Sequence, residues 1–386
     1  MEQNFNLRNF TTKIKSKEKK KITQYLKKII HSNWPKFFES FKKNYKYSYN
    51  EKFIKKFKKF KIINIIGMGG SSLGSKAIYY FLKNRIKKKV NFYENLSFKK
   101  EKNIKSLNLI ISKSGNTLET ITNFNSVFEK SDKNIFITEN NKNFLRKLAN
   151  KLKSEVVEHK NYIGGRFSVL SEVGMLPAEL MGLNESKFKQ FNNLITKKYF
   201  LENLVQNVLS IYKFTKKQKN NSVILNYDPL SENLFKWYQQ LVSESLGKKS
   251  KGIMPIISKM PKDNHSILQL YLSGFKKNFY TFYIVEENKT KKLKSNLLFD
   301  EFEFLKKKNF FEIVNSQRIA TENIFKNKSI PYRSFYVKKR SEETIGELFC
   351  FFTLEVILLS KLLNVNPLDQ PEVDLVKKET FKLLNN

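Results

Sequence analysis

The chain is short of the residues that build covalent or metal-based sites. Its 386 residues include one cysteine, Cys350, and three histidines. A single cysteine excludes an intramolecular disulfide and is typical of a reducing compartment. Cys350 lies in the apolar run LFCFFTLEVILL, so we expect a buried thiol. The chain has no zinc-finger spacing, and neither of its glycine-rich loops is a Walker A motif, GxxxxGK[ST].

Long apolar runs are also missing. The longest, residues 348–363, is interrupted by Glu355, Ser360 and Lys361. A membrane-spanning helix needs about 20 apolar residues, so this run is too short and too polar. The first 21 residues lack the apolar core of a signal peptide. We therefore expect a cytoplasmic protein.

Negative charge is scarce, with 35 acidic against 73 basic residues and a formal net charge of +38. Such a field attracts nucleic acid, anionic membranes and phosphorylated metabolites. The lysines are spread along the whole chain, however, without an arginine-rich arm or an aromatic RNA-binding motif. We interpret the charge as a compositional bias and expect no dedicated nucleic-acid or membrane partner.

Short apolar runs alternate with helical patterns in two regions of the chain, which is long enough for two to three domains. This alternation is typical of parallel sheets covered by helices on both faces. We expect an α/β fold with two doubly wound, mostly parallel sheets. The expected units are an N-terminal helical segment (1–56), two α/β domains (57–195 and 196–340) and C-terminal helices (341–386). The expected strands are 62–66, 90–93, 107–111, 134–138, 155–157, 223–227, 253–257, 279–285 and 332–337.

Two strand-to-helix loops predict a phosphate site. KIINIIGMGGSSLG (61–74) and IISKSGNTLET (110–120) each end an apolar strand in small, hydroxylated residues. Free N–H groups and a helix N-terminus converge at such loops and attract anions. Ser72 is also placed to cap the helix that follows it. The candidate phosphate ligands are Gly70, Ser71, Ser112, Lys113, Ser114 and Thr117.

These paired loops resemble those of sugar isomerase (SIS) domains, and later segments are similar to the glucose-6-phosphate isomerase (phosphoglucose isomerase) family. The segments are GGRFSVLSEVGMLPAELMG (164–182), WYQQLVSESLGKKSKG (237–252), DNHSILQLYLSG (263–274) and NVNPLDQPEVDLVKK (364–378). The resemblance implies two sugar-isomerase-type domains. It also implies an aldose–ketose isomerase of glycolysis and gluconeogenesis that interconverts D-glucose 6-phosphate and D-fructose 6-phosphate through a cis-enediol, without a metal ion or an organic cofactor.

The resemblance implies roles for five residues. Glu244 would carry a proton between C1 and C2 of the sugar, and Arg166 would stabilise the enediolate. His265 and Lys377 would assist ring opening, and Gln370 would bind the phosphate or the sugar. In the family the histidine reaches the site from the neighbouring subunit, so the resemblance also implies an obligate homodimer with shared active sites. The other histidines, His31 and His159, lie among lysines and are expected to be solvated.

Several alternatives stay open on the sequence. Glu244 could be a helix carboxylate paired with Lys248 one turn on, and Arg166 a structural ion pair. The C-terminal segment replaces two glycines of the family pattern, and Lys378 beside Lys377 leaves the identity of the site lysine open. The chain could also be a sugar isomerase domain enzyme that accepts mannose 6-phosphate as well, or a non-catalytic sugar-phosphate sensor that binds nucleic acid through its charge.

Overall fold

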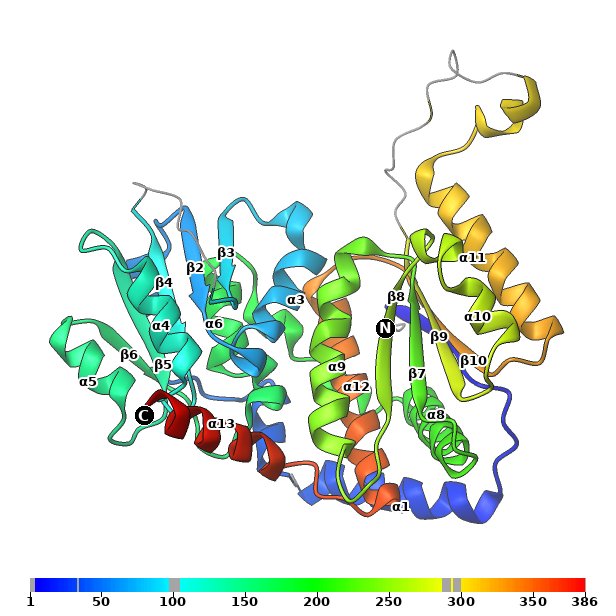
Figure 1. Cartoon of the computed structure of the whole chain (residues 1–386), viewed down its shortest axis with the longest axis horizontal. Coiled ribbons are helices and arrows are strands. Elements are labelled where there is room, and N and C mark those ends of the chain that lie inside the picture. Colours follow the sequence, from blue (N-terminus) through cyan, green and yellow to red (C-terminus); the bar gives the residue numbers. More distant parts are fainter. Residues whose placement is uncertain (1–3, 33–34, 97–104, 287–292, 294–299, 386) are drawn as a thin grey trace.

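The computed structural model describes residues 4–32, 35–96, 105–286, 293 and 300–385, which form two five-stranded sheets flanked by helices (Figure 1). The first sheet has the order β3-β2-β4-β5-β6 and is wholly parallel. The second has the order β1-β10-β9-β7-β8 and is parallel except for β1. The expected α/β architecture of parallel sheets is confirmed.

The strands are β1 (Phe5–Arg8), β2 (Ile62–Ile66), β3 (Lys89–Tyr93), β4 (Leu107–Ile111), β5 (Lys133–Thr138), β6 (Glu155–Glu158), β7 (Asn221–Asn226), β8 (Met254–Lys259), β9 (Asn278–Val285) and β10 (Tyr332–Val337). The α-helices are α1 (Ser16–Ser32), α2 (Glu51–Phe57), α3 (Leu73–Phe81), α4 (Leu118–Val127), α5 (Phe144–Lys151), α6 (Glu172–Leu180), α7 (Phe191–Leu194), α8 (Lys198–Lys216), α9 (Glu232–Leu246), α10 (Leu268–Ser273), α11 (Phe310–Asn327), α12 (Glu342–Leu363) and α13 (Pro371–Leu384). Each strand that the sequence predicts is present, with ends shifted by at most two residues.

The N-terminal segment departs from the prediction of helix alone. Its first described residues form β1, which pairs antiparallel with β10 in the second sheet. Phe5 and Leu7 are buried while their neighbours face solvent, as strand alternation requires. Four residues are too few for this period to be recognised in the sequence. Helix α1 packs against α8 in the second half of the chain, whereas α2 packs against α6 in the first half.

Both sheets change winding direction at an internal strand. From β2 the chain moves to β3 on one side, then returns to β4 on the other side of β2. In open α/β sheets, ligands bind beyond the carboxyl ends of the strands at such a switch point. The two predicted phosphate loops follow β2 and β4, so the topology brings them to this point.

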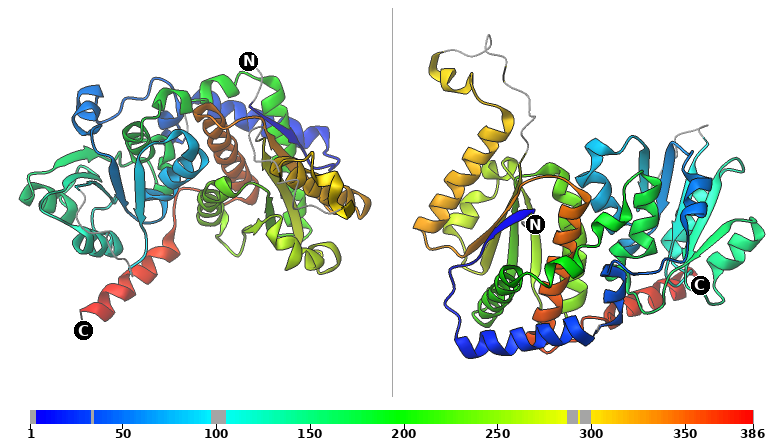
Figure 2. Two further views of the ribbon diagram at one scale, coloured as in Figure 1. Left: turned by 90° about the horizontal axis from the view of Figure 1, so that it is seen from above. Right: turned by 180° about the vertical axis from the view of Figure 1, so that it is seen from behind.

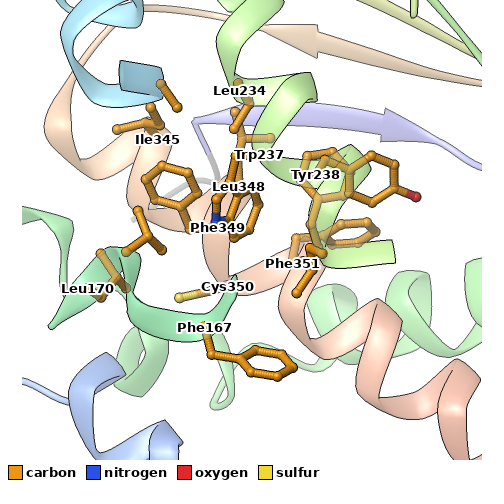
Figure 3. Packing of buried hydrophobic residues seen from close by; sticks show 14 of the residues in the cluster. Phe167, Leu170, Leu234, Trp237, Tyr238, Ile345, Leu348, Phe349, Cys350 and Phe351 are labelled. Atoms are coloured by element: carbon orange, nitrogen blue, oxygen red, sulfur yellow. The ribbon is translucent and has the colours of Figure 1, made fainter. Parts of the chain in front are cut away.

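Helices from both halves pack between the sheets (Figure 1), with α3 against α9 and α9 against α12. Helix α12 is buried along most of its length. Figure 3 shows Leu170 beside Cys350 and Phe349 of α12, with Trp237 of α9 nearby and the ring of Phe167 below them. The rings of Trp237 and Phe349 lie 4.7 Å apart in an edge-to-face arrangement. Cys350 is fully buried, as expected.

A buried ion pair joins α12 to the second sheet. Arg333 of β10 and Glu355 of α12 are both fully buried and bonded to each other. Asn207 and Tyr238 complete the network by bonding to Glu355. Further hydrogen bonds from Arg333 to Thr281 and Asn207 offset part of the cost of burying this charge pair, although Arg333 Nη2 has no hydrogen-bond partner among the described residues. The network links α8, α9, α12 and β10.

The last helix, α13, stands apart from this core. None of its residues is buried, and Figure 2 shows it extending beyond the two sheets. Its large apolar side chains are exposed, including Leu375, Val376 and Phe381. Among the described residues, no helix is both long and apolar enough to cross a lipid bilayer.

Candidate active site

The loop after β2 is where the parts of the site meet. It runs through η2 (Gly69–Ser71) and packs against η4 (Gly165–Leu170), the turn that carries Arg166. A Cβ on Gly70 would lie 2.2 Å from the carbonyl carbon of Gly165, so only glycine allows this approach. Ser168 fixes the contact by donating its hydroxyl to the Gly70 carbonyl at 3.2 Å and to the Gly165 carbonyl at 2.7 Å.

The same loop touches two other parts of the site. Gly69 has a φ of +53°, and a Cβ there would lie 2.9 Å from the side-chain amide nitrogen of Gln240 on α9. A Cβ on Gly67 would lie 2.9 Å from the carbonyl oxygen of Ile111, where the second loop begins. The glycines therefore let one loop contact the phosphate loop, the arginine turn and α9 together.

The second loop gathers hydroxyl groups at the N-terminus of α4. The hydroxyls of Ser112 and Thr117 lie 2.8 Å apart, and Ser112 Oγ also accepts from the Gly115 N–H at 3.2 Å. Gly115 takes a φ of +69° to make this turn. Lys113 donates to the carbonyl of Asn161 at 2.7 Å. Hydroxyls, N–H groups and a helix N-terminus at one place can bind a phosphate dianion.

Arg166 is the most heavily bonded side chain in the site, and it is 3% exposed. Its guanidinium donates to the Pro367 carbonyl at 2.8 and 3.2 Å and to the Asp369 carbonyl at 2.8 Å. It also donates to the side-chain oxygen of Gln370 at 2.6 Å and to Glu244 Oε2 at 2.7 Å. A planar, permanently charged group therefore holds the 364–370 turn against α9.

Glu244 is fixed through both of its carboxylate oxygens. Oε2 accepts from Arg166, and Oε1 accepts from Gln240 Nε2 at 2.7 Å one helical turn earlier on α9. Its side chain stays 25% exposed, so a ligand can reach it. A carboxylate has about four lone-pair positions, so each oxygen still has one free to take a proton.

The alternative pairing of Glu244 with Lys248 is wrong. Lys248 instead lies 2.9 Å from Asp369 and donates to the Asn366 carbonyl. Burial lowers the pKa of the Lys248 ammonium, and Asp369 opposes that shift. Helical spacing favoured Lys248, but Arg166 approaches from a turn 78 residues away in the chain.

Ser72 has a different role from the one expected. Its side chain makes no capping bond to α3. Its hydroxyl donates to Glu94 at 2.6 Å, and Glu94 is also paired with Lys76. Ser72 therefore links the loop after β2 to the residue after β3 through a charge-assisted hydrogen bond.

Two predicted residues lie outside this cluster. His265 is exposed at the end of η7 (Lys262–His265) and does not open a helix, since α10 starts three residues later. Lys377 is exposed on α13, with its Nζ 3.5 Å from Asp374 Oδ1. His31 is exposed as expected, whereas the expectation that His159 is solvated is wrong, because it is 2% exposed beneath the loops.

Sequence reasoning missed one side chain in the cluster, Gln240. It bonds the carboxylate of Glu244 and contacts Gly69. Its position four residues before Glu244 on a predicted helix was the available signal, because such residues share a face. Within the described ranges, no group of three or more His, Cys, Asp or Glu side chains is arranged to hold a metal ion.

Comparisons with known proteins agree on one family. The profile described as Phosphoglucose isomerase matches residues 7–260. A glucose-6-phosphate isomerase of Methanocaldococcus jannaschii is 32% identical over 341 residues, covering 83% of each chain. One of Mycoplasmopsis synoviae is 32% identical over 358 residues, covering 84% of this chain and 83% of that one.

Solved structures share the fold. A hypothetical protein from Thermus thermophilus superposes with a TM-score of 0.80 at 20% identity, covering 95% of both chains. A glucose-6-phosphate isomerase from Chlamydia trachomatis superposes with a TM-score of 0.67 at 17% identity, covering 86% of this chain and 72% of that one. At these identities the likeness concerns the fold alone.

Proposed function

The chain belongs to the phosphoglucose isomerase family, and we propose that Glu244 and Arg166 form the centre at which it interconverts D-glucose 6-phosphate and D-fructose 6-phosphate. The observation that carries the proposal is the 2.7 Å contact between these two side chains. There a carboxylate that can take up a proton, Glu244, meets the fixed positive charge of Arg166, and the loop after β4 is the proposed phosphate site. An aldose–ketose isomerase needs these three elements.

The phosphate end of the substrate would lie on the loop after β4. Ser112, Ser114 and Thr117 supply hydroxyl donors, and Lys113 adds a positive charge. Gly70 and Ser71 close the site from the neighbouring loop. This end of the molecule does not react, so its binding free energy serves to place C1 and C2 near Glu244.

The chemistry would proceed by proton transfer within the open-chain sugar. The Glu244 carboxylate takes the proton from C2 of glucose 6-phosphate, and negative charge develops on the carbonyl oxygen. Arg166 stabilises this oxyanion with the positive charge and the planar fork of its guanidinium. The proton of the C2 hydroxyl moves to O1, and Glu244 returns its proton to C1, which leaves the C1 hydroxyl and the C2 carbonyl of fructose 6-phosphate. Gln240 and Gln370 hold the carboxylate and the guanidinium in place.

A coupled assay of glucose 6-phosphate formation from fructose 6-phosphate tests this assignment. Glu244→Gln keeps the shape and the hydrogen bond from Arg166 but cannot take the proton, so kcat should fall by about 10³-fold or more. Glu232→Gln, on the same helix, is the control and should keep activity within about twofold. Wild-type activity in Glu244→Gln would overturn the role of Glu244 as the proton carrier.

We also propose that the enzyme is a cytoplasmic homodimer in which His265 completes the site of the partner. Two observations support this. His265 is exposed on one chain, and α13, a 14-residue helix without buried residues, is too short to be stable alone in water. Lys377 follows Gln370 by seven residues, close to two helical turns, so it shares the side of α13 that starts at the site. Lys378, one residue later, points about 100° away from Lys377 around the helix axis.

Mixing two inactive variants tests the shared site. Random reassociation of Glu244→Gln with His265→Asn makes half of the dimers mixed, and each mixed dimer has one intact site, which predicts recovery of about a quarter of wild-type activity. Recovery should be absent if both residues act within one chain. Lys377→Ala should slow turnover of the cyclic sugar more than Lys378→Ala does.

A further inference from the structure

The first sheet carries a second concave surface at its other edge. A cavity of about 480 Å³ opens at the amino ends of β5 and β6, below the turns that end α2 and α5. Its volume lies in the range of small-molecule sites. The phosphate loops follow the carboxyl ends of β2 and β4 in the same parallel sheet, about 16 Å away along the five residues of β4. The cavity is therefore separate from the candidate active site.

Lysine dominates the lining of this cavity. Seven of its fifteen residues are lysines, against 73 lysines and arginines in all 386 residues of the chain. The compositional bias alone would place about three basic residues there. The lysines that the argument uses are Lys56, Lys59, Lys130, Lys133, Lys151 and Lys153.

The local negative charges do not balance these lysines. Glu155 is paired with Lys56, and buried Asp132 accepts hydrogen bonds from Ser106 and Asn108 within the sheet. Helices α2, α4 and α5 end at this edge, and each C-terminus contributes about half a negative charge. Counted together with the two carboxylates, they leave an excess of between about three and four positive charges. A bound anion of similar charge would balance this excess.

The floor of the cavity is apolar. Phe57 and Phe60 are buried beneath it, while Phe128 and Leu152 remain partly accessible. An apolar floor ringed by flexible ammonium groups suits a molecule that combines a ring with several phosphates. We propose that this cavity binds a polyphosphate-bearing small molecule of the nucleoside triphosphate class, with the phosphate chain on the lysines. The proposal does not depend on the isomerase assignment.

Calorimetry with ATP tests the site in magnesium-free buffer at 0.15 M salt. Saturating fructose 6-phosphate is present to occupy the phosphate loops. Wild-type protein should bind ATP with a Kd below about 1 mM. The variant Lys59→Gln/Lys133→Gln/Lys151→Gln should bind at least tenfold more weakly while keeping isomerase activity. The control Lys236→Gln/Lys307→Gln/Lys326→Gln removes the same charge from exposed positions elsewhere and should change the Kd by less than twofold.

Other outcomes decide against the site. Equal weakening in both triple variants would mean that the overall field of the protein binds ATP. Displacement of ATP by fructose 6-phosphate would place it in the active site. Tripolyphosphate and adenosine, tested separately, identify the recognised part: tripolyphosphate should bind and adenosine alone should not, and the reverse result would overturn the proposal. If tripolyphosphate bound with the same Kd as ATP, the site would recognise the phosphate chain alone, and inorganic polyphosphate would be as good a ligand as a nucleoside triphosphate.

A second measurement does not depend on the variants folding. In wild-type protein, ATP should protect Lys59, Lys133 and Lys151 from acetylation by acetic anhydride, read by mass spectrometry. The control lysines, Lys236 and Lys326, should react at unchanged rates. Equal protection at all positions, or none, would contradict binding in the cavity.

Discussion

Replacing Arg166 by lysine separates the charge of the guanidinium from its geometry. The side chain makes five hydrogen bonds, three of them to the carbonyls of Pro367 and Asp369 in the 364–370 turn. Lysine keeps the positive charge but has three donors on a single nitrogen, so it cannot reach the turn, Gln370 and Glu244 at once. Arg166→Lys therefore leaves buried acceptors unsatisfied and leaves Glu244 held by Gln240 alone.

The magnitudes follow from these contacts. Two carbonyls left without donors, at about 1–3 kcal/mol each, should lower the free energy of unfolding by about 2–6 kcal/mol. Losing one donor to the developing oxyanion typically lowers kcat by about 10²–10³-fold. The KM for fructose 6-phosphate should change less than kcat, because the phosphate loops keep their structure.

Steady-state kinetics with a coupled assay, together with urea denaturation, measures both effects. Arg318→Lys is a matched control, because Arg318 is similarly buried at 9% exposure and bonded to Glu322 on α11, away from the site. It should lose stability but keep kcat. If Arg166→Lys kept kcat/KM within about threefold of wild type, the fork geometry of Arg166 would have no part in catalysis.

Three further changes have expected outcomes. Gly70→Ala places a Cβ 2.2 Å from the carbonyl carbon of Gly165, so the loops must separate and the coupled assay should show at least a tenfold fall in kcat/KM. Gly115→Ala must adopt a φ of +69° at a cost of about 1–2 kcal/mol, which should raise the KM for fructose 6-phosphate and leave kcat nearly unchanged. Burial lowers the pKa of His159 from 6.5 to about 4, so between these values the unfolded chain binds the proton and the free energy of unfolding falls as pH falls. At pH 5 this group should lower the free energy of unfolding by about 2 kcal/mol. Urea denaturation should show that His159→Gln lacks this pH-dependent loss, whereas the exposed His31→Gln keeps it.

The strands of both sheets could be predicted because each is a short β-branched or aromatic run with a turn at either end. The two loops were predictable for the same reason, since small hydroxylated residues mark the ends of β2 and β4. Strand β1 could not be found, because its four residues bury only Phe5 and Leu7. Its pairing with β10 depends on a segment more than 300 residues away.

The contacts inside the site show where sequence reasoning stops. Spacing along α9 suggested Lys248 as the partner of Glu244, yet Arg166 makes that contact and Lys248 bonds to the 364–370 turn instead. Spacing along a helix identifies which side chains share a face of that helix. It does not show whether a residue from another element makes a closer contact. The burial of His159 was missed for a similar reason, since charged neighbours in the sequence do not show whether other elements cover a side chain.

Within one chain, Glu244 and Arg166 are fixed by many contacts, whereas His265 and Lys377 are exposed. The proposed chemistry accounts for this difference. Proton transfer between C1 and C2 needs Glu244 and Arg166 at fixed distances from the sugar, and a shift of about 1 Å costs roughly 10²-fold in rate. These two residues are locked by α9, the 364–370 turn and the glycine contacts of the loop after β2. Ring opening requires only that a donor and an acceptor reach the ring oxygen and the anomeric hydroxyl, so exposed residues such as His265 and Lys377 would be sufficient for it in the proposed homodimer. In a shared active site, each subunit would therefore hold Glu244 and Arg166 rigidly and could present His265 and Lys377 on exposed elements.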